Sequence, residues 1–413
     1  MRAVGAVVGA LAAVSVGFAP SAIAYDAQSK QWYLEPMQTA AMWKGSTGKG
    51  VNVAVIDSGV NPNTPSLKGQ VLADEVPKAV AYRSTDDYSG HGSTMAELIA
   101  GTGSGGGLQG LAPGAKIVPY RVDLEGVPGG AEGRKKTPEP WQAIRAAADS
   151  DAKIISMSFG GLVSPHEEEA VKYAASKGKL MIAAAGNAGR GNGQIDYPAA
   201  YPYVIGVAAA NKSLTVSKFS SYGNYVDLAA PGEAIPGWCN ADFRSYCDEQ
   251  GTSAATALTS AAAALIWSAH PDWTVNQVTR ALIDTAGRTW AKSNPSKYAG
   301  YGFIRPRLVL ENPDYNAGPA NVDPLAKDNG GDLLAKSSSK SSSSSSPSAS
   351  ASASSQAPEK GSAKGSTGGT SAAGSSVESS DDSNTLWIAL GAAAAVVVIG
   401  GAGVAVTRAR RAR

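Results

Sequence analysis

This 413-residue chain has few histidines, few cysteines and a small net charge, and each of these features limits the classes of function that the chain can have. The chain has three histidines, two cysteines and a formal net charge of +2. Without Arg2 and the four arginines of the C-terminal TRARRAR, the charge of the central part is −3, which argues against a nucleic-acid partner. The stretch GSTGKG precedes its strand and has no Ser or Thr after the lysine, so it is not a phosphate loop. We therefore expect no cofactor and no bound metal.

The two ends of the chain resemble targeting signals. Residues 1–24 combine an early arginine, an apolar run and the small residues Ala22 and Ala24, which is typical of a signal peptide cleaved before Tyr25. Residues 386–406 contain no charge and would span about 31 Å as a helix, which matches a bilayer core of roughly 30 Å. We predict a single transmembrane helix over 385–407 and a basic cytoplasmic tail over 408–413, with the catalytic domain outside the cytoplasm at the cell membrane.

Three segments are expected between these ends. Residues 25–44 form a short N-terminal extension, residues 45–312 a folded domain, and residues 313–384 a flexible stalk rich in Ser, Ala and Gly. Cys239 and Cys247 lie close together in the folded domain, and in an oxidising exterior such a pair favours a disulfide over a metal site.

The folded domain alternates short apolar runs with helical patterns, which predicts an α/β fold with a parallel central sheet flanked by helices. Strands are expected at 51–56, 115–122, 153–158, 180–185 and 204–209, and helices at 92–100, 140–149, 165–177, 253–269 and 275–285. Ser164-x-x-Glu167 and Thr274-x-x-Gln277 match capping boxes at two helix starts. Functional side chains should gather beyond the carboxyl ends of the strands.

Three separate residues are candidates for chemistry. Ser253 opens an alanine-rich helix, where a hydroxyl is either a helix cap or a nucleophile. Asp57 ends the first strand and by itself fits a turn as well as it fits catalysis. His166 and His270 are explained by helix ends, whereas His91 lies between glycines, where neither a cap nor a core requires it.

Together these residues would supply acyl transfer to a polypeptide substrate. Ser253 would attack a peptide carbonyl, His91 would take its proton and pass it to the leaving amine, and Asp57 would hold the imidazole. Asn187 is either a turn residue or an oxyanion donor that acts with the backbone N–H of Ser253. Activity should fall on acidification as His91 titrates around the ordinary pKa of about 6.5, shifted by its neighbours.

At these residues the chain resembles the subtilisin-like (S8 family) serine proteases. The order Asp, His, Ser is that of the family, and VIDSGV, GHGSTMAELIAG, ISMSFGG, AAAGNAG and GTSAATALTSAAAALI all look like family blocks. The resemblance implies that a substrate pairs as an added strand beside one segment, which also borders the P1 pocket, and that a second segment forms the opposite wall. The first segment is Ser158, Phe159 and Gly160, and the second is Ala184, Ala185 and Gly186.

The whole layout resembles the mycosins, which are membrane-anchored subtilases associated with type VII secretion. This likeness implies partners among type VII secretion membrane components. The alternative is a structural component of a secretion complex in which proteolysis is dispensable. The chain departs from the family at Glu97, where glycine is usual, at Ala257, where proline is common, and at Phe159, where leucine is frequent.

Two loops also differ from those of relatives. Residues 101–110 are rich in glycine and contain no carboxylate, so we expect no calcium where several relatives bind it. Residues 124–140 form a longer connection whose glycines and prolines oppose regular structure. This second loop is either a tolerated surface insertion or a mobile lip over the substrate cleft.

Overall fold

The structure is a computed structural model and describes residues 26–124, 126–189 and 195–329. The predicted signal peptide, membrane helix and cytoplasmic tail lie outside these ranges, as does most of the predicted stalk. Within the described ranges, every helix is too short or too polar to cross a bilayer.

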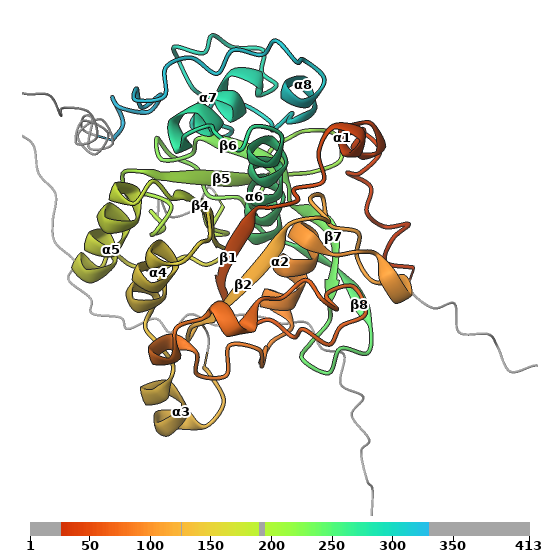
Figure 1. The fold of residues 1–413 in the computed structure, drawn as a ribbon, viewed down its shortest axis with the longest axis vertical. Helices are drawn as coiled ribbons and strands as arrows, with labels where there is room; N and C mark the ends of the chain where they lie inside the picture. Colours follow the sequence, from red (N-terminus) through yellow and green to blue (C-terminus); the bar gives the residue numbers. More distant parts are fainter. Residues whose placement is uncertain (1–25, 125, 190–194, 330–413) are drawn as a thin grey trace, which may run out of the picture. The chain divides into compact units, whose positions relative to one another are not determined.

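Six parallel strands form the central sheet, in the order β2-β1-β3-β4-β5-β6 (Figure 1). All five predicted strands are confirmed to within one residue at each end. The sixth strand was not predicted, because it is short and ends in proline, which only a sheet edge tolerates well. The bounds are β1 Asn52–Asp57, β2 Lys116–Arg121, β3 Ile154–Met157, β4 Leu180–Ala184, β5 Val204–Ala210 and β6 Leu228–Pro231.

Helices cover both faces of this sheet, which is why its strands read as continuous apolar runs. Successive side chains alternate between faces, so Val53 and Val55 of β1 belong to one hydrophobic core and Ala54 and Ile56 to the other. The first core includes α2 (His91–Ala100), α6 (Thr252–Ala269) and α7 (Val275–Thr285). The second includes α4 (Pro140–Asp149) and α5 (Pro165–Ser176). All five predicted helices are thus confirmed.

The helix starts follow the predicted signals. Thr274 and Gln277 form the expected reciprocal capping box at α7. At α5, Ser164 accepts the backbone N–H of Glu167, which is the serine half of the predicted box. Helix α6 is apolar on nearly all sides because its small residues, mostly alanine, let it lie within the core against β3, β4, β5 and β6.

A two-stranded antiparallel hairpin lies beside α2. It consists of β7 (Glu233–Trp238) and β8 (Tyr246–Gln250), and the predicted disulfide between Cys239 and Cys247 is present across it. The remaining short elements are α1 (Thr39–Gly45), α3 (Gly130–Lys136), α8 (Arg307–Leu310) and 3-10 turns at 73–75, 78–80 and 104–106.

Helix α3 corrects our expectation that the 124–140 loop opposes regular structure. Gly129 precedes the helix in the left-handed region (φ 97°), a conformation that glycine adopts without strain. Basic side chains occupy the last turn, where the helix dipole favours positive charge. Glycine at the start and cations at the end therefore permit one short helix within the loop.

Both flanks of the predicted domain pack onto it. Tyr33 of the N-terminal extension is fully buried, and Gln31 donates to Gln109 O. Beyond residue 312, Leu325 is buried, and Arg280 of α7 donates to carbonyl oxygens between 317 and 322. The folded part thus continues past the expected stalk boundary, because a few apolar residues anchor a segment whose average composition is polar.

Candidate active site

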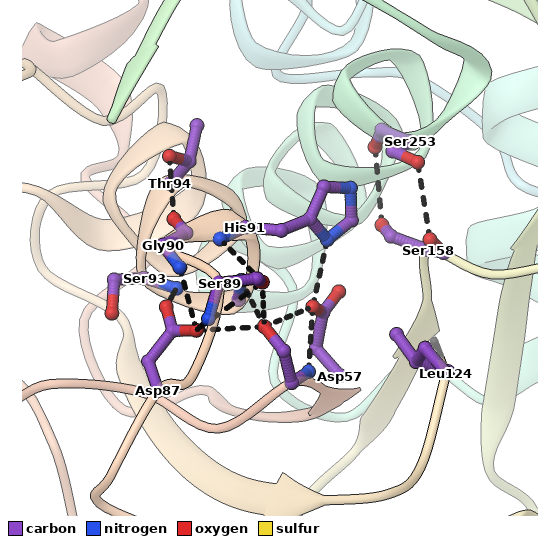
Figure 2. A network of polar contacts seen from close by, with 12 residues as sticks. Asp57, Asp87, Ser89, Gly90, His91, Ser93, Thr94, Leu124, Ser158 and Ser253 are labelled. Atoms are coloured by element: carbon purple, nitrogen blue, oxygen red, sulfur yellow. Dashed lines mark hydrogen bonds and ion pairs between the residues drawn. The ribbon is translucent and has the colours of Figure 1, made fainter. Parts of the chain in front are cut away.

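Three elements of the fold bring Asp57, His91 and Ser253 to one cleft. Asp57 is the last residue of β1, His91 the first of α2, and Ser253 lies in the first turn of α6. His91 Nδ1 lies 2.7 Å from Asp57 Oδ1, and the aspartate is fully buried. Figure 2 shows the imidazole ring between the carboxylate and Ser253. The contact fixes the ring through Nδ1 and leaves Nε2 for a second partner.

The hydroxyl of Ser253 makes its hydrogen bond to the end of β3. Ser253 Oγ donates to Ser158 O at 3.0 Å, and Ser158 Oγ donates in return to Ser253 O at 3.1 Å. Rotation about the Cα–Cβ bond of Ser253 would turn Oγ from this carbonyl toward His91. In unliganded active sites the hydrogen bond between the nucleophile and its base is often long or poorly aligned, and it tightens when substrate binds.

A buried carboxylate that the sequence analysis missed holds the start of α2. Asp87 accepts hydrogen bonds from the backbone N–H groups of Gly90 and Ser93, both at 2.8 Å. Its Oδ1 also lies 2.8 Å from Ser58 Oγ, which in turn lies 3.1 Å from Asp57 Oδ1. The position of Asp87, four residues before a histidine flanked by glycines, was the available signal.

Neighbouring acids control the charge of the imidazole. Burial opposes protonation of His91, but the charge and hydrogen bond of Asp57, with the charges of Glu249 and Asp87, outweigh it and raise its pKa to about 9. Glu249 lies on β8 and lines the same cleft, a role that the sequence did not reveal.

Two N–H donors converge beside the Ser253 hydroxyl. A Cβ atom added to Gly251 would lie 3.7 Å from Asn187 Nδ2 and 3.7 Å from Ser253 N, so both groups border one point. Asn187 is oriented by Thr252, whose backbone N–H and hydroxyl both donate to Asn187 Oδ1. A carbonyl oxygen that enters between these two groups and approaches each nitrogen to hydrogen-bond distance would accept from both, which is the arrangement that stabilises a tetrahedral oxyanion.

The cleft has a volume of about 630 Å³ and contains most of the residues expected to hold substrate. Ala185 is the exception among them. It is fully buried in a separate cluster with Ala208, Val226 and Ala229, because side chains alternate along the extended backbone after β4. The expected residues that line the cleft are Ser158, Phe159, Gly160, Ala184 and Gly186.

The described residues contain no cluster of three or more His, Cys, Asp or Glu side chains that could hold a metal ion.

Comparison with known proteins agrees with this geometry. Residues 48–302 match the Subtilase family, and the chain belongs to this family of serine proteases. Thermitase from Thermoactinomyces vulgaris is 34% identical over 289 residues, which cover 65% of this chain and 95% of thermitase.

Two solved structures connect the fold to type VII secretion proteases. MycP1 with its N-terminal propeptide removed is 26% identical, with a TM-score of 0.56 over 70% of this chain and 99% of that one. The MycP3 protease from the type VII (ESX-3) secretion system is 28% identical, with a TM-score of 0.56 over 69% of this chain and 88% of that one. The chain is thus a subtilisin-like serine protease related to the mycosins.

Proposed function

We propose that the protein is an endopeptidase that cleaves polypeptides through an acyl-enzyme formed on Ser253. The observation that carries this proposal is the 2.7 Å contact between His91 Nδ1 and the buried Asp57, in the same cleft as the Ser253 hydroxyl. A base oriented by a carboxylate beside a hydroxyl nucleophile is the arrangement that acyl transfer requires.

The reaction would begin when Ser253 Oγ turns from Ser158 O and gives its proton to His91 Nε2. Oγ then bonds to the peptide carbonyl carbon, whose oxygen takes the negative charge and accepts hydrogen bonds from Asn187 Nδ2 and Ser253 N. Collapse of this intermediate breaks the C–N bond, and the imidazolium protonates the departing amine. A water molecule then gives a proton to His91 and attacks the ester carbonyl carbon. The bond between that carbon and Ser253 Oγ breaks, and the imidazolium returns the proton to Oγ.

We further propose that the enzyme works outside the cytoplasm at the cell membrane and acts with type VII secretion components. The predicted signal peptide and membrane helix support the location, and the likeness to MycP1 and MycP3 supports the secretion role. The predicted positions of the leader, anchor and tail are part of this proposal.

A fluorophosphonate probe tests the chemistry directly. We expect it to modify Ser253 in the wild type and to leave Ser253→Ala unmodified. Ser260→Ala is the matched control, because Ser260 lies two turns further along α6 and bonds to Ser156 Oγ, away from the cleft. A folded wild type that resists the probe would contradict the proposal.

The same variant separates proteolysis from a structural role in secretion. Comparing cells that carry Ser253→Ala with cells that lack the gene, by mass spectrometry of secreted proteins, tells which is required. Loss of cleavage with secretion retained in Ser253→Ala, but not in the deletion, would assign secretion to the folded protein and cleavage to the serine.

A further inference from the structure

The cleft contains a buried carboxylate that the proposed chemistry does not use. Asp196 lines the same cleft as His91 and Ser253, yet only 6% of its surface is exposed. A carboxylate so far removed from water is costly unless charged or polar groups compensate it. Its position within the cleft is therefore informative about what the cleft binds.

Asp196 lies between the two segments that border the P1 pocket. A Cβ atom added to Gly160 would lie 3.2 Å from Asp196 Oδ1, and one added to Gly186 would lie 1.8 Å from Asp196 Oδ2. The carboxylate therefore touches both walls, and each wall is a glycine where it does so. Any side chain at Gly186 would displace the carboxylate, and φ of +103° there also favours glycine.

The surroundings hold Asp196 in this position. Ser221 Oγ lies 3.4 Å from Asp196 Oδ2, and Ser221 N donates to Gly186 O, so the same residue contacts both the carboxylate and the wall. Ala200 N donates to Asp196 O. The carboxylate is thus fixed by its own segment and by Ser221.

Apart from the imidazole of His91, the charged side chains that line the cleft are negative. Among the described residues that line it, the carboxylates are Asp196 and Glu249, and none is a lysine or an arginine. Glu249 lies on the β7–β8 hairpin, whereas Asp196 lies between the glycine walls. A substrate cation would find complementary charge at the P1 pocket.

We infer that Asp196 selects substrates with lysine or arginine at P1, so that the enzyme cleaves after basic residues. A long cationic side chain would reach the carboxylate beside Gly160 and Gly186 and pair with it, whereas an apolar one would cover the carboxylate without adding an opposite charge. This inference rests on the proposed peptidase function and specifies its substrate class.

Peptidyl phosphonates test the inference, because they modify Ser253 without requiring turnover. Two tripeptidyl diphenylphosphonates would differ only at P1, one with lysine and one with its uncharged analogue norleucine. The wild type should react with the lysine compound about 30-fold faster or more, since losing a partner from a buried charge pair has effects of this size. Asp196→Asn should bring the two rates to within a few fold, mainly by slowing the lysine compound.

Glu249→Gln is the matched control, since it removes the other cleft acid, and it should keep the lysine preference. A wild type that reacts equally with both compounds, or prefers norleucine, would overturn the inference even if Asp196→Asn failed to fold. Retention of the lysine preference by folded Asp196→Asn would overturn it as well. Failure of both compounds and of a small fluorophosphonate to modify folded wild type would instead overturn the peptidase proposal on which the inference rests.

Discussion

Thr252 donates two hydrogen bonds to the same oxygen of Asn187, from its backbone N–H at 2.9 Å and from its hydroxyl at 3.0 Å. Both bonds hold the amide oxygen against Thr252, and the amide nitrogen of Asn187 borders the same point as Ser253 N. Thr252 is fully buried and would act through Asn187 rather than on the substrate. It is a positioning residue for the proposed oxyanion site.

Thr252→Val should therefore lower kcat without a matching change in KM. The variant loses the hydroxyl, which donates to Asn187 Oδ1 and accepts from Gly186 N, but it keeps the backbone bond to Asn187. We therefore expect a fall of about 10-fold, smaller than the 10²- to 10³-fold expected for Asn187→Ala. Steady-state hydrolysis of one peptide by both variants measures the split.

The control for this prediction is Thr256→Val, one turn further along α6. Thr256 is also fully buried, and its hydroxyl donates to Thr252 O. A similar fall in kcat for both variants would show that the effect comes from packing in α6, and would contradict a positioning role for Thr252.

The raised pKa of His91 predicts an alkaline pH profile. The base must be neutral to accept a proton, and with a pKa of about 9 most imidazoles are charged at pH 7. Hence kcat/KM should rise from pH 7 to about 9 and level off above that, later than the ordinary pKa of about 6.5 would give. Peptide hydrolysis between pH 6 and 10, with circular dichroism as a check on folding, measures this limb.

Stability should change in the opposite direction. Because the folded protein holds the His91 proton more tightly than the unfolded chain, this contribution to stability is complete below about pH 6.5 and is lost as pH rises through about 9. An activity limb centred at or below pH 6.5 would contradict the assignment of Asp57, Glu249 and Asp87 as the groups that hold the proton.

Glu249→Gln should move the activity limb to lower pH. The charge of Glu249 favours the imidazolium form of His91, so its removal leaves more neutral base at pH 7. We expect kcat/KM at pH 7 to increase by about two- to five-fold. Glu233→Gln is the control, since Glu233 begins β7 of the same hairpin, and it should leave the limb in place. A limb that stays in place in Glu249→Gln would remove Glu249 from the group that sets this pKa.

The layered core could be predicted from the sequence because its signals are local. Continuous apolar runs indicated five of the six central strands, and capping signals at Ser164 and Thr274 marked the starts of α5 and α7. The hairpin β7–β8 was missed because strand β8 is largely exposed and holds cysteine, aspartate and glutamate rather than an alternating apolar pattern. Glu97 similarly departs from its family pattern without a local explanation. In the structure it is fully buried and accepts hydrogen bonds from Thr64 and Tyr246, which connects α2 to that hairpin.

The candidate site likewise contains residues that the sequence could predict and residues that it could not. Asp57, His91 and Ser253 stood out because each follows or opens an element and elimination among three histidines was possible. Asp196, Glu249 and Thr252 did not, since their significance lies in which side chains they face across the cleft. The order of residues along one strand predicts a face, but long-range contacts between loops and the hairpin depend on the complete fold.

The 124–140 loop reaches the cleft through Leu124, Gly126 and Pro128, so we expect it to affect extended substrates. Deletion of residues 130–138 should alter hydrolysis of long peptides more than that of short esters, because only long peptides extend to this edge. Asp123→Ala is the finer test, since Asp123 accepts hydrogen bonds from Gly126 N at 3.0 Å and from Arg134 Nε at 3.0 Å.

Losing these bonds from Asp123 should loosen the part of the loop that lines the cleft. We expect KM for a long peptide to rise by about three- to ten-fold, with hydrolysis of a small ester unchanged, because Asp123 accepts three hydrogen bonds of about 1 kcal/mol each, from Gly126 N, Val127 N and Arg134 Nε. Lys135→Ala is the matched control, because Lys135 is exposed on α3 of the same loop, and it should change neither substrate. Equal effects on peptide and ester would mean that Asp123 acts through the whole fold, and no effect on either would make the loop an inert insertion.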